Sequence, residues 1–81
     1  MTIDRKEVGN RLKAIRMLHG MTQAEIGKIA SVTPQQWSRY EAGMDTIGAE
    51  ALTLVCSRFG LSADVILGLR ARSREPIPPI E

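Results

Sequence analysis

Hydrophobic residues recur every three or four positions along most of the chain, the spacing that places them on one face of an α-helix. The first such stripe consists of Val8, Leu12, Ile15 and Leu18. It predicts a helix from Asp4 to Leu18, ended by Gly20. Later stripes predict helices over residues 23–30, 34–42, 48–59 and 63–67. Because no apolar and polar alternation typical of strands persists, the sequence predicts an all-α fold of five helices.

Two of these predicted helices begin with the same pattern. Thr22 stands three residues before Glu25, and Thr33 stands three residues before Gln36. Both pairs match a capping box, in which a hydroxyl and a carboxylate or amide satisfy the free N–H groups at a helix start. Pro34 follows at the first helical position, where the missing N–H of proline is harmless. Two short helices joined by a tight turn form the geometry that places a helix in the DNA major groove.

The size and composition of the chain indicate one small globular domain. The 81 residues are 43% hydrophobic, 25% charged and 4% aromatic, which predicts a mainly aliphatic core. We expect a domain over residues 1–69 and a flexible tail over residues 70–81. The tail contains three arginines and the proline-rich stretch EPIPPIE, so it is an alternative source of DNA or partner contacts.

The sequence gives little support to a membrane protein or an enzyme. It has neither an apolar run of roughly 18 residues nor the apolar segment of a signal peptide, so we expect a soluble, cytoplasmic protein. His19 and Cys56 are the only histidine and cysteine, and neither has partners at metal-ligand or triad spacing. We therefore expect no cofactor, no metal and no catalytic residues.

The segment from Arg11 to Leu69 resembles the lambda-repressor-like, or Cro and Xre, helix-turn-helix family of bacterial and phage regulators. The resemblance rests on Arg16, Gly20, Met21-Thr22-Gln23, Ile26-Gly27, Val32-Thr33, Glu41-Ala42-Gly43, Phe59-Gly60-Leu61-Ser62 and Ile66-Leu67-Gly68. Two positions depart from the family pattern. Ser31 replaces the usual turn glycine, which predicts a steric cost if the backbone φ is positive. Pro34 replaces a polar side chain that contacts DNA in many relatives, so base reading should shift to later residues.

The resemblance implies separate roles for the two central helices. The later helix should read bases through Gln35, Gln36 and Arg39, because glutamine matches the N6 and N7 atoms of adenine and arginine matches O6 and N7 of guanine. The DNA backbone should be contacted by Gln23, Thr33, Ser38 and Thr46. Gln36 has an alternative use in the capping box, and Arg39 in pairing with a carboxylate or phosphate. Asp45 should repel phosphate and weaken the approach of its loop.

The resemblance also implies a structural ion pair between Arg16 and Glu41. If this pair is largely buried, removing one partner should cost about 3–5 kcal/mol. The resemblance further implies a symmetric dimer that binds a pseudo-palindromic DNA site, because one helix in one groove gives little specificity. The candidate dimer surface comprises Leu61, Val65, Ile66 and Leu69. A core role for most of these four side chains is the alternative.

The sequence therefore predicts a sequence-specific DNA-binding transcription regulator, a repressor that binds double-stranded DNA as a homodimer. The alternative is an antitoxin or adaptor that uses the same domain to hold a toxin or another partner protein. The modest net charge of +2 is compatible with both functions.

Overall fold

Five helices form the regular structure of residues 3–68, the part of the chain that this computed structural model describes. They are α1 (Arg5–Leu18), α2 (Gln23–Ala30), α3 (Pro34–Glu41), α4 (Ala49–Phe59) and α5 (Ala63–Leu67). These residues contain no strand, so the prediction of an all-α fold is confirmed. Three predicted helix ends were wrong by one residue, because Asp4 and Gly48 are N-caps and Ala42 is a C-cap. The predicted tail over residues 70–81 lies outside the described residues.

The two predicted capping boxes form to different extents. The Thr22 hydroxyl accepts a hydrogen bond from the Glu25 N–H at 3.1 Å, and the Thr22 N–H donates to the Glu25 carboxylate at 2.8 Å. The Thr33 hydroxyl likewise accepts from the Gln36 N–H at 3.0 Å. The Gln36 side chain instead donates to the carboxylate of Asp45, a charged acceptor that forms a stronger hydrogen bond than a neutral one. The second capping box is therefore only half formed.

The turn between α2 and α3 contains Ser31, Val32 and Thr33. Ser31 has φ 62° and ψ 40°, and among residues 3–68 no other residue besides glycine has a positive φ. The serine therefore occupies the left-handed conformation that glycine adopts without steric cost, so the condition for the predicted steric cost is met. Val32 packs against the core and fixes the turn to the domain.

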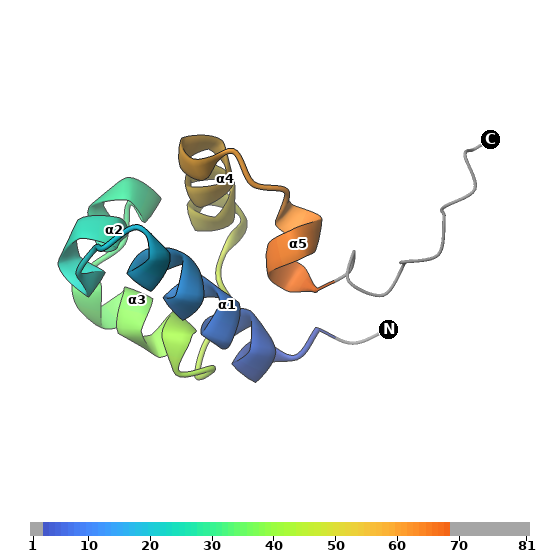
Figure 1. The fold of residues 1–81 in the computed structure, drawn as a ribbon. Coiled ribbons are helices and arrows are strands. Elements are labelled where there is room, and N and C mark those ends of the chain that lie inside the picture. Colours follow the sequence, from blue (N-terminus) through green and yellow to red (C-terminus); the bar gives the residue numbers. More distant parts are fainter. Residues whose placement is uncertain (1–2, 69–81) are drawn as a thin grey trace.

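The core lies where α1, α2, α3 and α4 meet, and α5 closes it beside α1 and α4 (Figure 1). Its buried hydrophobic side chains are Val8, Leu12, Ile26, Ala30, Trp37, Tyr40, Ile47, Ala51, Val55 and Ile66. The Trp37 and Tyr40 rings meet edge to face, with their centroids 6.0 Å apart. These aromatic side chains turn one face of α3 inward and leave the opposite face at the surface.

α1 and α3 approach each other closely at Gly9. A Cβ atom at this position would lie 2.5 Å from the carbonyl oxygens of both Tyr40 and Glu41, a separation that real side chains do not show. The absence of a side chain at Gly9 thus allows the end of α3 to lie against α1. This contact fixes the orientation of α3 and hence the set of side chains that it exposes.

The predicted dimer surface requires a correction. Ile66 is fully buried in the core of its own chain, because α5 inserts this side chain between its neighbours, and it has no surface to offer a partner. Leu61 is half-buried against the same core, whereas Val65 is 46% exposed. Leu69 lies outside the described residues. Among the three predicted residues that the structure describes, Val65 thus has the most exposed side chain.

Candidate nucleic-acid interface

The outward face of α3 presents the three side chains predicted to read bases. Gln35 and Arg39 are exposed, and Gln36 and Ser38 are half-buried, while Trp37 points into the core. The cap at Thr33 and the proline at the first helical position define where this face begins. The structure therefore brings Gln35, Gln36 and Arg39 to one helix surface.

A carboxylate from the loop after α3 joins two of these side chains. Arg39 donates from Nε to Oδ2 of Asp45 at 2.8 Å and from Nη2 to Oδ1 at 3.3 Å. Gln36 donates from Nε2 to Oδ2 at 2.9 Å. The side chains of Arg39 and Asp45 are 48% and 36% exposed, so this set lies at the surface. Asp45, Gln36 and Arg39 are called the Asp45 cluster below.

The Asp45 cluster keeps its carboxylate ionised. Hydrogen bonds from Arg39 and Gln36, helped by the positive charge of Arg39, lower the pKa of Asp45 to about 2 from its ordinary 3.8. The carboxylate is therefore charged at neutral pH. The sequence indicated only that Asp45 would repel phosphate, because its distance from Arg39 in space depends on the path of the loop.

A second carboxylate, that of Glu41, is held in the interior. Arg16 donates from Nε to Oε2 of Glu41 at 2.5 Å and from Nη2 to Oε1 at 3.1 Å. Gln23 donates from Nε2 to Oε1 at 3.1 Å, and the indole N–H of Trp37 donates to Oε2 at 2.6 Å. The side chains of Arg16 and Glu41 are only 15% and 6% exposed. These four residues are called the Glu41 cluster below.

The hydrogen bonds of the Glu41 cluster offset the free-energy cost of burying the charged carboxylate. Burial alone would raise the pKa of Glu41, but the hydrogen bonds from Arg16, Gln23 and Trp37, with the charge of Arg16, lower it below its ordinary value. Arg16 also donates from Nη1 to the carbonyl oxygen of Met21 at 3.0 Å, and thereby ties α1 to the start of α2. The sequence resemblance implied the pair of Arg16 and Glu41 but not the hydrogen bond that Trp37 donates to it.

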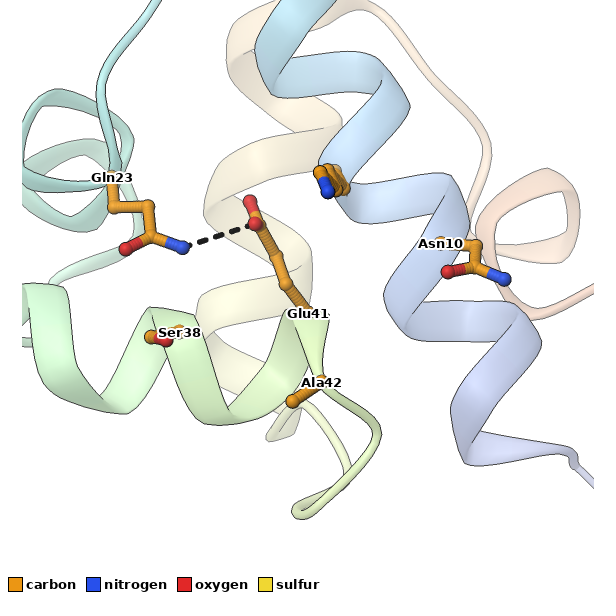
Figure 2. Close-up of a pocket in the computed structure, with 6 residues that line it drawn as sticks. Asn10, Gln23, Ser38, Glu41 and Ala42 are labelled. Carbon is orange, nitrogen blue, oxygen red and sulfur yellow. Dashed lines mark hydrogen bonds between the residues drawn. The ribbon is translucent and has the colours of Figure 1, made fainter.

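An open hollow of about 240 Å³ lies between α1, the start of α2 and α3. It is lined by Asn10, Lys13, Gln23, Ser38, Glu41 and Ala42 (Figure 2). Figure 2 shows Gln23 reaching across to the Glu41 carboxylate, whose charge is paired with Arg16. Lys13 is exposed and forms no ion pair within residues 3–68. The hollow thus combines two predicted backbone contacts, Gln23 and Ser38, with a cation that sequence reasoning did not select.

The other predicted backbone contacts lie on either side of α3. Thr33 is exposed, and its hydroxyl oxygen accepts the capping hydrogen bond. Thr46 is exposed in the loop between α3 and α4. This loop is attached to α1, because Arg5 donates from Nη1 to the carbonyl oxygen of Met44 at 3.4 Å. Thr46 therefore lies in a loop that this contact links to α1, two residues after Met44.

His19 and Cys56 carry the groups that suggest other chemistry. His19 is exposed and stacks on Phe59, with the two ring centroids 4.3 Å apart. Cys56 is half-buried, and burial raises the pKa of its thiol. Residues 3–68 contain no group of three or more His, Cys, Asp or Glu side chains that could hold a metal ion. In the same range, no helix has both the length and the apolar character required to cross a membrane.

Comparison with solved structures gives two similar chains of the clp gene regulator ClgR from Corynebacterium glutamicum. One has a TM-score of 0.70 and 27% identity, and the match covers 95% of this chain and 100% of that one. The other has a TM-score of 0.73 and 29% identity, with 89% and 77% covered.

Comparison of sequences gives a curated relative and a family model. The relative is Antitoxin PezA from Streptococcus pneumoniae serotype 4, with 31% identity over 61 residues. The match covers 75% of this chain and 39% of PezA, so this chain spans well under half of that protein's length. A family model described as helix-turn-helix matches residues 12–66. The chain therefore belongs to the helix-turn-helix family, of the Cro/Xre type predicted from its sequence.

Proposed function

We propose that the protein is a sequence-specific DNA-binding transcription regulator that places α3 in the major groove. One observation carries the proposal: α3 buries Trp37 and exposes the polar side chains of Gln35 and Arg39 on the opposite face. The helix-turn-helix family and the similarity to ClgR, a gene regulator, support it. The proposed role is binding and regulation, not catalysis.

Base reading is assigned to three side chains of α3. Gln35 and Gln36 each carry an amide that can donate to N7 and accept from N6 of adenine. Arg39 carries paired donors that match O6 and N7 of guanine, and each good bidentate contact is worth about 1–3 kcal/mol of discrimination. Because Pro34 has no N–H and no polar side-chain atom, the reading surface begins one residue later.

Backbone contacts are assigned to the hollow and to the flanking threonines. A phosphate at the hollow would face Lys13 of α1, Gln23 at the N-terminal end of α2 and Ser38 of α3. The free N–H groups at the start of α2 favour an anion there. Gln23 uses one N–H of its amide on Glu41 and retains a second for a phosphate oxygen. Thr33 and Thr46 would contact the backbone on either side of α3. These contacts position the domain but carry no sequence information.

We further propose that the regulator is a repressor that acts as a symmetric dimer on two half-sites ~34–36 Å apart, because a single short helix reads few base pairs. The exposed side chain of Val65, together with Leu61 and Leu69, is the proposed dimer surface. Analytical sedimentation at micromolar concentration tests this assembly. A monomer both alone and on DNA would contradict it.

Selection from a pool of randomised duplexes tests the DNA-binding proposal. The wild-type chain should enrich one motif, with pseudo-twofold symmetry if it binds as a dimer. A Gln35→Ala/Arg39→Ala double variant is the control, because both side chains are exposed and the core is untouched. It should fold normally and lose the motif. Failure of the wild type to enrich a motif, or enrichment of the same motif by the double variant, would refute the proposal.

An antitoxin is the second candidate function, and the similarity to PezA supports it. The similarity covers 39% of PezA, so it does not extend to the greater part of that protein. Co-expression with the product of the neighbouring gene would test this function. A stable complex that protects the cell from that product supports an antitoxin, and absence of a complex rejects it.

A further inference from the structure

We propose that Asp45 is a positioning residue for DNA reading, which holds Arg39 and Gln36 so that their unused donor and acceptor atoms face the bases. The proposal rests on the proposed function and deepens it. Its basis is the geometry of the Asp45 cluster, in which one carboxylate accepts three hydrogen bonds from two proposed base-reading side chains.

The contact with Arg39 uses only one edge of the guanidinium. Asp45 accepts from Nε at 2.8 Å and from Nη2 at 3.3 Å, which are the two donors on the lateral edge of the planar group. The terminal edge, formed by Nη1 and the second N–H of Nη2, stays available. Two donors at that edge can bind O6 and N7 of one guanine while the carboxylate remains in place.

The contact with Gln36 also leaves a reading edge available. Its Nε2 has two N–H groups, and Asp45 accepts from Nε2 at 2.9 Å. The remaining N–H and the carbonyl oxygen Oε1 are the pair that adenine N7 and N6 require. A single carboxylate can thus orient both side chains without using the atoms that would read DNA.

Asp45 is itself held by backbone contacts to the residue that it orients. The N–H groups of Met44 and Asp45 approach the carbonyl oxygen of Arg39 at 2.9 and 3.4 Å. Gly43, with φ 77°, turns the chain so closely against α1 that a Cβ there would lie 3.0 Å from the Cα of Lys6. Because the loop is fixed, the carboxylate can order the long Arg39 side chain before DNA arrives, which lowers the entropic cost of binding.

The charge of Asp45 adds discrimination against phosphate. The carboxylate is ionised, and it would repel a DNA backbone that approached α3 without forming the base contacts. In the cognate complex the base contacts of Arg39 and Gln36 offset this repulsion, whereas a nonspecific complex lacks those contacts. Asp45 should therefore raise the ratio of specific to nonspecific affinity rather than affinity as such.

Binding measurements on variants of the 81-residue chain test this role. Asp45→Ala, Asp45→Asn and Asp45→Glu would be titrated against the duplex that the wild type enriches and against a scrambled duplex of the same composition. Asp45→Ala should lower the affinity ratio of the two duplexes about tenfold, with Asp45→Asn intermediate. Asp45→Glu retains the carboxylate and should recover part of the ratio. Asp64→Asn, an equal charge change in α5, should leave the ratio unchanged.

The possible outcomes separate this proposal from the proposed function. If Asp45→Ala binds both duplexes more tightly but leaves their affinity ratio unchanged, Asp45 only repels the DNA backbone. This result would overturn the positioning role. A higher ratio would show that Asp45 competes with DNA for Arg39 and would also overturn it. A wild-type chain that does not distinguish the duplexes refutes the proposed function, and the positioning role with it. Circular dichroism melting checks that each variant is folded.

Discussion

Glu41 and Asp45 are held by the same kinds of donor in opposite surroundings. Each carboxylate accepts from Nε and Nη2 of an arginine and from Nε2 of a glutamine. The Glu41 side chain is 6% exposed and accepts a further bond from Trp37, whereas the Asp45 side chain is 36% exposed. Burial, rather than the chemistry of the pair, therefore separates a contact in the interior from a contact at the surface beside the proposed base-reading side chains.

The difference follows from what replaces each contact when it is broken. Loss of a partner at Glu41 leaves a charge that water cannot reach, so the cost is large. Loss of one partner at Asp45 leaves the other partner in contact with water, and hydrogen bonds to water replace most of the lost interaction. The domain therefore combines a Glu41 cluster that is buried between its helices with an Asp45 cluster that lies at the surface on the outer face of α3.

Glu41→Ala should have the largest effect on stability. It leaves Arg16 and Trp37 without their common acceptor, and we expect a loss of about 3–5 kcal/mol in the free energy of unfolding. For a domain of this size, that corresponds to a fall of at least ~12 °C in Tm, measured by circular dichroism. Asp45→Ala is the matched control and should melt close to wild type. Equal melting of the two variants would contradict the distinction between the clusters.

Trp37→Phe should have an intermediate effect. The substitution keeps an aromatic ring in the core but removes the N–H that donates to Glu41 at 2.6 Å, and a hydrogen bond to a charged group is worth about 1.5–3 kcal/mol. Urea unfolding followed by circular dichroism measures the loss. Tyr40→Phe, which removes a polar atom from the neighbouring ring, is the control and should lose less. An equal loss would show that the indole N–H contributes little.

Acid should weaken the domain through both carboxylates. The pKa of Glu41 lies below its ordinary value of 4.5, and the pKa of Asp45 lies below its ordinary value of 3.8. Each ionised carboxylate therefore stabilises the fold fully at a pH above its ordinary pKa. This stabilisation is lost as the pH falls through the lowered pKa, which for Asp45 is about 2. Melting curves between pH 7 and 2 should show a weaker pH dependence in Glu41→Gln, and a smaller change in Asp45→Asn. An unaltered acid transition in Glu41→Gln would contradict the assigned role of Glu41.

Lys13→Ala should have the smallest effect, and only on DNA binding. If a phosphate occupies the hollow, the variant should weaken binding to all duplexes alike and reduce the slope of log K against log salt by about 1. Lys28→Ala, an exposed lysine in the last turn of α2 and outside the hollow, is the control. Equal salt slopes for Lys13→Ala and wild type would show that Lys13 in the hollow does not contact a DNA phosphate.

The sequence predicted the helices because their limits depend on neighbouring residues. The Thr22 capping box, the proline at the start of α3 and the left-handed Gly60 after α4 each act within a few positions. The positive φ of Ser31 relates instead to the resemblance, because the family usually has glycine at this turn position. The one-residue errors at Asp4, Gly48 and Ala42 reflect caps, which belong partly to the helix.

The contacts within the two clusters could be predicted only in part. The resemblance implied that Arg16 pairs with Glu41, but the hydrogen bond from Trp37 depends on how the indole packs. The approach of Asp45 to Gln36 and Arg39 depends on the loop path, which backbone contacts to α1 and α3 determine. Short-range patterns carry no information on such contacts.

The central claim is that Arg39, held by Asp45, reads a guanine at its O6 and N7 atoms. The direct test replaces each guanine of the enriched duplex in turn with 7-deazaguanine, which lacks the N7 acceptor, and measures the affinity of wild type and Arg39→Ala. At one position the wild type should lose about tenfold in affinity, and Arg39→Ala should show no further loss there. Equal losses in the two proteins at every guanine would contradict the claim.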